Sequence, residues 1–161
     1  MSKVLKRFKA LLPRVLDVCV YEYMLSIDPP EIELALDLNI SVKQDAKGYS
    51  FYAAHKGMPV NENHIIFNNR LGKQLGYTNV LMLADSNTAE LYRGKNIQAY
   101  MLTYIARYFA ALNDQDAVYV FTYTDNTAMQ RSLVKAKYKK LYRAKVYRIA
   151  GMRVYVRRLH E

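Results

Sequence analysis

Residues 91–104 of this 161-residue chain read Leu-Tyr-Arg-Gly-Lys-Asn-Ile-Gln-Ala-Tyr-Met-Leu-Thr-Tyr, a glycine turn that leads straight into an amphipathic segment. Apolar residues then recur at the i, i+3, i+4, i+7 spacing of a helix, at Ile97, Tyr100, Met101, Tyr104, Ile105, Tyr108, Phe109 and Leu112. The first N–H groups of a helix have no partner within it and lie at the positive end of its dipole. Arg93 and Lys95 add positive charge there, so the stretch predicts a phosphate or pyrophosphate site.

The flanking sequence places this turn in an alternating order of strands and helices. An apolar run at 80–84 precedes the turn, and a second run at 117–123 follows the helix. Asp125-Asn126-Thr127-Ala128 then opens another helix, with residue types that bond to free N–H groups at a helix start. The predicted order is strand, phosphate turn, helix, strand and capped helix.

This order and two motifs resemble the GCN5-related N-acetyltransferases, an acyl-coenzyme A-dependent family whose pyrophosphate turn is often Gln-Tyr-Arg-Gly-Lys-Gly-Ile-Gly. The matching residues are Tyr92, Arg93, Gly94, Lys95 and Ile97. Asn-Thr-Ala at 126–128 and Lys-Ala-Lys-Tyr-Lys at 135–139 are similar to the family's Asn-x-Ala and Lys-Leu-Gly-Phe-Lys signatures. The resemblance covers residues 47–158 and implies an α/β (α+β) fold with a mixed, mostly antiparallel central sheet flanked by helices.

The resemblance also implies a site for acetyl-coenzyme A, or another acyl-coenzyme A, as co-substrate, with no metal. In the family the strand before the turn pairs with the pantetheine arm, and a backbone N–H, here of Thr88 or Ala89, polarises the thioester carbonyl. The implied coenzyme-binding residues are Ser86, Asn87, Thr88, Ala89, Leu91, Tyr92, Arg93, Gly94, Lys95, Asn96, Ile97, Asn126 and Arg131. Arg131, Lys135 and Lys137 are either partners for the adenosine phosphates or cations of a solvated helix face.

Several features depart from the family's pattern. Leu91 replaces Gln or Arg, and Asn96 replaces Gly or Ala, although Asn accepts left-handed backbone angles better than most residues. Leu133 stands where the family often has the tyrosine that protonates the leaving thiolate, so no hydroxyl acts from there. Only residues 43–48 join two predicted strands between which the family has helices of the acceptor site. The acceptor side is therefore built by residues 1–38, supplied by a second copy in a homodimer, or missing.

The residues available as a general base are Glu22, His55, His64, Asp85, Glu90 and Tyr123. Asp85 comes first because it lies on the strand predicted to line the cleft, and Glu90 comes second. His55 and His64 lie on opposite strands of a predicted hairpin. Because no cysteine or carboxylate lies at ligand spacing, we expect a structural pair or unrelated surface residues rather than a metal site. The sequence has no Walker loop and no dinucleotide fingerprint, which removes ATPase and dehydrogenase functions.

The composition predicts a single domain over residues 1–161, with an N-terminal extension at 1–38 and an acyl-coenzyme A-binding core at 39–161. Cys19 is the one cysteine and, between two valines, is expected to be a buried thiol. No apolar run is long enough to span a bilayer and no signal-peptide core precedes the domain, so we expect a cytoplasmic location.

The net charge of +10 favours anionic partners. Residues 2–12 predict a basic amphipathic helix that either docks on the domain or lies on an anionic membrane surface. Tyrosines and basic residues interleave at 138–158, but the apolar alternation there predicts a hairpin turning at Ala150-Gly151 rather than a nucleic-acid surface. Further strands are predicted at 15–25 and 35–42. A hairpin is predicted at 49–67, with strands at 51–55 and 59–67 around Lys56-Gly57.

Together these features predict an acyl-coenzyme A-dependent N-acyltransferase. Within the family the chain looks most like members linked to polysaccharide and cell-envelope assembly, which implies an amino-sugar or envelope precursor as the acceptor amine. The alternative is a catalytically silent module of the same fold that binds coenzyme A or an anionic partner as a regulatory or scaffold protein. Leu91, Asn96 and Leu133, which all lie at functional positions, motivate this alternative.

Overall fold

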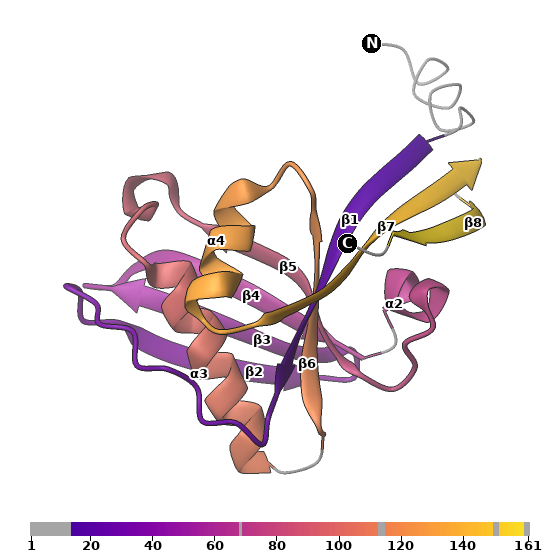
Figure 1. The fold of residues 1–161 in the computed structure, drawn as a ribbon. Coiled ribbons are helices and arrows are strands. Elements are labelled where there is room, and N and C mark those ends of the chain that lie inside the picture. The colour runs from indigo at the N-terminus through magenta and orange to yellow at the C-terminus, as the bar shows by residue number, and fades with distance from the viewer. Residues whose placement is uncertain (1–13, 68, 113–114, 150–151, 160–161) are drawn as a thin grey trace.

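Strands form a single sheet that carries helices on both faces (Figure 1). The computed structural model describes residues 14–67, 69–112, 115–149 and 152–159. The strand order is β2-β3-β4-β5-β6-β1-β7-β8, and every neighbouring pair is antiparallel except β5 and β6, which are parallel. This confirms the predicted mixed, mostly antiparallel sheet. The elements are β1 (Arg14–Met24), β2 (Asn39–Asp45), β3 (Gly48–His55), β4 (Met58–Ile66), α2 (Arg70–Leu75), β5 (Leu81–Thr88), a 3-10 turn η1 (Glu90–Tyr92), α3 (Ile97–Leu112), β6 (Ala117–Tyr123), α4 (Thr127–Lys135), β7 (Lys139–Ile149) and β8 (Met152–Leu159).

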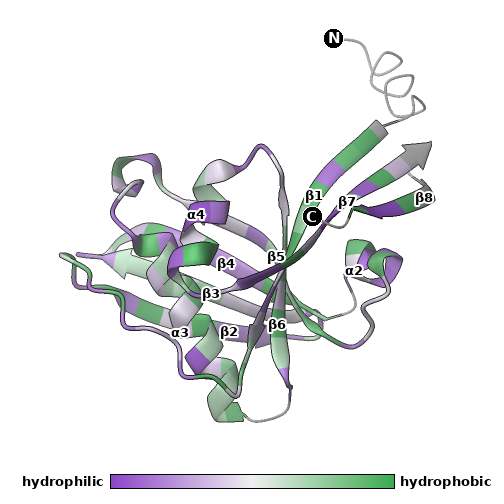
Figure 2. Ribbon diagram, in the orientation of Figure 1, coloured by the Kyte–Doolittle hydropathy of each residue, from purple (hydrophilic) through white to green (hydrophobic). Residues whose placement is uncertain are grey.

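Helices α3 and α4 cover the same face of the sheet (Figure 1). The predicted helical stripe is confirmed up to Phe109: α3 buries Ile97, Met101, Ile105 and Phe109 and packs its tyrosines against the core, whereas Leu112 is 45% exposed. The helix therefore appears mixed green and purple in Figure 2. The largest core cluster lies between these helices and the strands and includes Tyr21, Phe51, Ile65, Leu83, Met101, Leu102, Ile105, Phe109, Val120 and Leu133. A smaller cluster on the opposite face lies under α2 and includes Val18, Val20, Leu75, Ala144 and Val146.

Strand β1 lies inside the sheet, between β6 and β7. Val20 stands opposite Phe121 on β6 and opposite Tyr142 on β7. Residues 18–21 are all buried, as a strand covered on both faces requires, and the Cys19 thiol is among them as predicted. The division into an extension at 1–38 and a core at 39–161 therefore does not follow the sheet, because a strand from the extension joins two strands of the core.

The remaining predicted strands are present in the structure, with shifted boundaries at β2 and at the start of β3, which is Gly48. The strand predicted at 35–42 begins later, at Asn39, and runs to Asp45. It meets β3 in a tight turn in which Asp45 Oδ1 accepts the N–H groups of Lys47 at 2.7 Å and Gly48 at 3.1 Å. A side chain at Gly48 would overlap Ile65 O, which a Cβ atom would approach to 2.0 Å. The connection predicted at 43–48 is even shorter in the structure, because residues 43–45 belong to β2 and Gly48 begins β3. It contains no helix.

Two further regions complete the fold. The hairpin around Lys56-Gly57 and the one formed by β7 and β8 are both confirmed, although the turn at 150–151 and the basic helix predicted at 2–12 lie outside the described residues. Helix α2 was not predicted from the sequence, since six residues are too few to show a period; Asn69 caps its start and Gly76 ends it at a φ of +91°. Within the described part of the chain, no helix is long and apolar enough to cross a bilayer.

Candidate functional site

Strands β5 and β6 begin side by side and then part. Residues 81–83 pair in parallel with residues 118–120, and beyond these pairs β5 continues to Thr88 and β6 to Tyr123 without contact in the ladder. Backbone N–H and C=O groups in this gap therefore have no partner strand on one side. Between the two strands lies a cleft of about 850 Å³.

A β-bulge in β5 lies at the point of divergence. Leu83 stands opposite Ile65 of β4, and Asp85 stands opposite His64, so that Ala84 is an extra residue without an opposite partner. A bulge bends its strand and increases its local twist. The bulge accounts for β5 leaving β6 immediately after Leu83.

The cleft runs from the bulge to the start of α3 and to the first turns of α4. Its lining comes from four segments that are far apart in the chain. They are Leu83, Ala84, Asp85, Ser86, Asn87 and Thr88 on β5; Tyr92, Arg93, Gly94, Asn96, Ile97 and Gln98 at the turn; Val120, Phe121, Thr122 and Tyr123 on β6; and Asn126, Ala128, Met129, Arg131, Ser132 and Lys135 at α4.

The structure brings most of the residues predicted for the site into this one cleft. Ser86, Asn87, Thr88, Tyr92, Arg93, Gly94, Asn96, Ile97, Asn126 and Arg131 line it, together with the candidate base Asp85. Four predicted residues lie outside the lining, namely Ala89, Glu90, Leu91 and Lys95. Leu91 is 85% exposed, and Lys95 places its Nζ 5.2 Å from the ring centre of Tyr92.

The backbone of β5 excludes one of the two residues, Thr88 and Ala89, predicted to donate to the thioester carbonyl. Ala89 N–H donates to Val60 O at 2.9 Å, so it is not available to a ligand. In an antiparallel ladder alternate residues direct their N–H and C=O groups to the same side. Ser86 and Thr88 therefore direct theirs away from β4 and into the gap, where Arg93 Nε donates to Thr88 O at 3.1 Å. The free backbone N–H nearest the bulge on this side belongs to Ser86.

The glycine turn has the backbone conformation that an anion site at a helix start needs. Gly94 has a φ of +78° and Asn96 a φ of +59°, so the asparagine adopts the left-handed angle for which it was expected to be suited. A Cβ atom at Gly94 would meet nothing within 4 Å, which leaves the space above the turn open. The first helical hydrogen bond of α3 joins Tyr100 N–H to Asn96 O, so the N–H groups of residues 97–99 precede the helical ladder.

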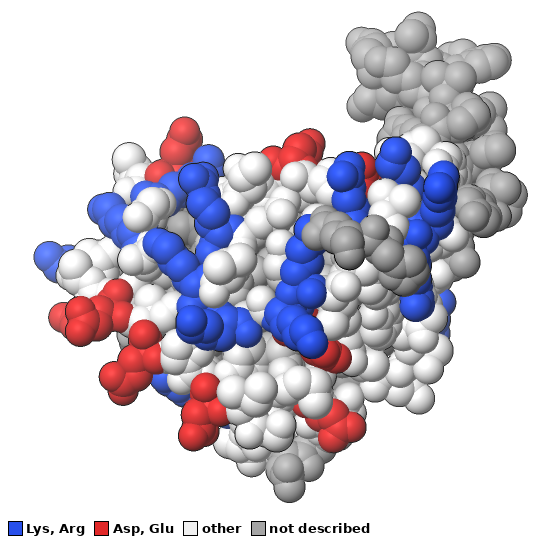
Figure 3. Space-filling view, in the orientation of Figure 1, with Lys and Arg blue, Asp and Glu red and all other residues white. Residues whose placement is uncertain are grey.

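Positive side chains surround this helix start. Arg93, Arg131 and Lys135 line the cleft, whereas Lys137 does not. Lys135 Nζ donates to Asn96 Oδ1 at 2.7 Å, which ties α4 to the turn and keeps the asparagine side chain from capping α3. Figure 3 shows Lys and Arg side chains gathered over α4 and the neighbouring turn. Charge and helix dipole therefore favour an anion at the same place.

A buried polar network that the sequence did not reveal joins β4, β5 and α3. Asn63, fully buried, accepts at Oδ1 from Ser86 Oγ at 2.7 Å and from Gln98 Nε2 at 2.9 Å. Asn61, 5% exposed, donates to Thr88 Oγ1 and to Gln98 Oε1, both at 2.8 Å. The network fixes the strand that lines the cleft to the first turn of α3. It also places Ser86 and Thr88 on the α3 face of the sheet.

Asp85 and Asn87 alternate with these residues and therefore lie on the opposite face. Both are exposed and line the cleft. His64, directly across from Asp85, has its Nδ1 2.9 Å from Ser50 Oγ. The cleft thus passes through the sheet, from the helix-covered face to a face with exposed polar side chains.

His55 and His64 do not form a pair, which leaves the alternative of unrelated residues. In the hairpin His55 stands opposite Met58, and its Nδ1 is 2.9 Å from Asp37 O, whereas His64 stands opposite Ser50. His55 lies next to the Lys56-Gly57 turn, whereas His64 lies towards the far end of β4. The hairpin register therefore separates the two rings. Among the residues that the structure describes, no three His, Cys, Asp or Glu side chains are grouped to hold a metal ion.

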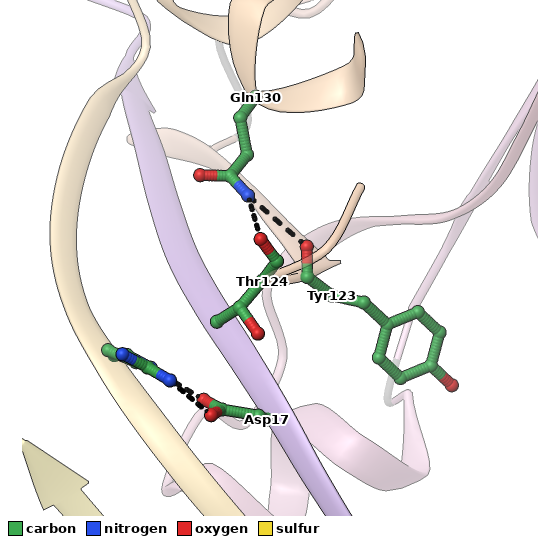
Figure 4. Close-up of polar contacts among 5 residues, drawn as sticks. Asp17, Tyr123, Thr124 and Gln130 are labelled. Atoms are coloured by element: carbon green, nitrogen blue, oxygen red, sulfur yellow. Dashed lines mark hydrogen bonds and ion pairs between the residues drawn. The ribbon is translucent and has the colours of Figure 1, made fainter. Parts of the chain in front are cut away.

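The end of β6 is held firmly beside the cleft (Figure 4). Gln130 of α4 donates from Nε2 to Thr124 O at 2.9 Å and to Tyr123 O at 3.3 Å, and Asn126 Oδ1 caps α4 by accepting Met129 N–H at 3.1 Å. Because the cap occupies Asn126 Oδ1, the amide nitrogen of this side chain is the group left to bind a ligand.

On the neighbouring strands, both carboxylate oxygens of Asp17 accept from the Arg143 guanidinium, which joins β1 to β7. This hydrogen bonding lowers the pKa of Asp17 below its ordinary value of 3.8. The pair also lies next to β6, because Thr124 N–H donates to Asp17 O at 3.0 Å. Strands β1, β6 and β7 are therefore joined at the end from which the cleft opens.

No family model and no curated protein matches the sequence. Solved structures do match the fold. A GNAT-family acetyltransferase from Colwellia psychrerythraea is 14% identical with a TM-score of 0.58, over 86% of this chain and 57% of that one. A GCN5-related N-acetyltransferase from Sphaerobacter thermophilus is 13% identical with a TM-score of 0.58, over 89% and 54%. A functionally unknown protein from Staphylococcus epidermidis is 12% identical with a TM-score of 0.55, over 91% and 66%.

These likenesses show that the chain has the fold of the GCN5-related N-acetyltransferases, as its motifs predicted. The chain spans between about half and two thirds of the length of the structures that it matches. At such low identity the comparison speaks for the fold, and the roles of individual residues rest on the cleft itself.

Proposed function

We propose that the chain transfers an acyl group from acyl-coenzyme A to an amine. The observation that carries this proposal is the continuity of the cleft: it leads from a helix start with free N–H groups and positive side chains to a gap between two parallel strands. The helix start suits the anionic head of a ligand, and the gap between the strands suits a long polar arm.

The residues present fit acyl-coenzyme A along its length. The N–H groups of 97–99 and the open space at Gly94 suit a pyrophosphate, with Arg93 beside them. Arg131 and Lys135 suit the remaining phosphate. The free backbone groups of β5 suit the amide groups of the pantetheine arm, as an added strand would.

Acyl transfer needs a hydrogen-bond donor to the carbonyl oxygen and a path for the amine proton. Ser86 N–H, which faces the gap, takes the first role in this proposal. Asp85 takes the proton from the attacking amine, because it is exposed at the cleft on the face opposite α3. The amine therefore reaches the cleft from that face, and an amino-sugar or envelope precursor is the acceptor to screen first. We propose a cytoplasmic location for this activity.

A catalytically silent module is the second candidate, favoured by one observation. Leu133, at the position where the family often has a catalytic tyrosine, is fully buried in the core and does not line the cleft. A silent module would bind the coenzyme at the same turn and transfer nothing.

The test is a thermal-shift titration with acetyl-coenzyme A, with free adenosine phosphates as a control for charge. A ligand that binds only the folded state raises the unfolding midpoint. A midpoint that rises with acetyl-coenzyme A more than with adenosine phosphates supports the donor site, and equal or absent shifts contradict it. Release of coenzyme A thiol with a panel of amines then separates the acyltransferase from the silent module.

A further inference from the structure

The Thr122 hydroxyl is a buried polar group without a hydrogen bond in the described part of the chain. Thr122 is only 5% exposed, and it lines the cleft. An unsatisfied buried hydroxyl destabilises a folded protein, and most such groups in proteins find a partner. The hydroxyl therefore lowers stability, and it belongs to a residue that lines a cleft.

The strand pattern shows that the hydroxyl is not needed for packing. On β6 the residues that face α3 are Val118, Val120 and then Thr122, and the two valines belong to the main core. Valine has nearly the same shape as threonine and would fill this position without an unsatisfied group. Thr122 thus continues the row formed by Val118 and Val120, but it carries one polar atom, its hydroxyl oxygen.

The position of Thr122 relates that atom to the proposed reaction. Val120 is the last β6 residue that pairs with β5, and Thr122 follows two residues later, where the strands have parted. It faces the same side of the sheet as Ser86 on the opposite wall of the cleft. A thioester held in the gap would lie between these two donors.

We propose that the Thr122 hydroxyl donates a hydrogen bond to the thioester sulfur of bound acyl-coenzyme A as it leaves as a thiolate. This inference rests on the proposed function. The amine nitrogen forms a bond to the carbonyl carbon, the carbon–sulfur bond breaks with its electron pair on sulfur, and the amine proton passes to Asp85 or water. Thr122 keeps its proton, because an alcohol is a much weaker acid than a thiol, whose pKa is about 8.5. The thiolate later takes its proton from water.

Such a bond supplies the stabilisation that Leu133 cannot. Leu133 lies in the core and carries no polar atom. Thr122 lines the cleft from β6, whereas Leu133 belongs to α4. In this proposal the donor to sulfur is therefore on the strand and not on α4.

The test compares Thr122→Val and Thr122→Ser with the parent protein, each saturated with coenzyme A. The pKa of the bound thiol is followed by the ultraviolet absorbance of its thiolate, which needs no acceptor amine. We expect Thr122→Val to raise this pKa by about one unit or more, because a hydrogen bond to a charged group is lost. Thr122→Ser keeps the hydroxyl and is expected to keep the parent pKa. The unfolding midpoint of Thr122→Val should equal or exceed that of the parent.

The outcomes separate this inference from the function on which it rests. If the parent does not bind coenzyme A, both fall together. If the parent binds and Thr122→Val leaves the thiol pKa unchanged, the role of Thr122 alone is overturned. A lower unfolding midpoint for Thr122→Val would also overturn it, because the hydroxyl would then have a structural partner.

Discussion

The two faces on which the cleft opens are built in different ways. On the α3 face, the polar network ties Ser86 and Thr88 to Gln98, and Arg93 donates to Thr88 O. On the opposite face, Asp85 and Asn87 are exposed, and a tight turn replaces any helix between β2 and β3. Under the proposed function, a rigid backbone holds the donor, whereas exposed side chains on separate strands choose the acceptor.

The largest effect is expected from a carboxylate placed on the donor side. Gly94→Glu should weaken acetyl-coenzyme A binding by about a thousandfold, since like charges a few ångströms apart near a protein surface repel by about 4 kcal/mol. Gly57→Glu is a matched control: Gly57 also has a φ of +78° and open space at its Cβ, but lies in the β3–β4 turn. Isothermal titration of both variants checks the prediction, and equal affinities would remove the turn from the site.

On the acceptor side, Asp85→Asn should lower the rate of acyl transfer by about a hundredfold, as loss of a general base does. Binding of acetyl-coenzyme A should stay within about twofold of the parent, because the donor lies on the other face. Rates of thiol release with an accepted amine, beside titration of the coenzyme, measure the two effects. A loss of affinity as large as the loss of rate would show that the two faces are not separate.

The free energy of unfolding tests whether the polar network holds β5 to α3 on the donor side. Asn63→Ala should lower the free energy of unfolding by about 2–3 kcal/mol, because it leaves the partners of a fully buried side chain unpaired. Asn39→Ala, at an exposed position on β2, is the control and should change it by less than about 0.5 kcal/mol. Denaturant unfolding measures both. An equally small effect at Asn63 would mean that the network does not hold β5 to α3.

The smallest effect concerns the ion pair beside β6. Asp17→Asn should lower the free energy of unfolding by about 1 kcal/mol at pH 7, a value suited to a partly exposed pair. Because the folded-state pKa of Asp17 lies below 3.8, its contribution is present above that pH and disappears as the pH falls through the lowered pKa. The parent and the variant should therefore converge in acid. A difference that is independent of pH would assign the effect to packing.

Local signals in the sequence were enough for the donor side. The helical period, the glycine turn and the asparagine cap of α4 each involve residues within a few positions of one another, and all appear in the structure as predicted. The place of β1 in the sheet depended on pairing between distant segments. The unbroken apolar run at 18–21 was nevertheless a sign of a central strand in the sequence, and all of its residues are buried in the structure.

The residues that the sequence could not assign are those whose role depends on which face is buried. Asn61 and Asn63 alternate with Glu62 and His64, so both faces of β4 read as polar and neither is marked as core. Thr122 fits a strand pattern as well as valine does. Only the divergence of β6 from β5 makes this residue part of the cleft wall. Pairing with β4 occupies the Ala89 N–H, whereas the divergence of β5 from β6 leaves the Ser86 N–H without a partner strand.

Backbone amide NMR during titration with acetyl-coenzyme A tests the central claim most directly. If the cleft between β5 and β6 is the donor site, the N–H signals of Ser86, Gly94 and Gln98 shift together and saturate at one affinity, while Gly57 remains unchanged. Shifts confined to other strands, or no shifts at saturating coenzyme, would contradict the account.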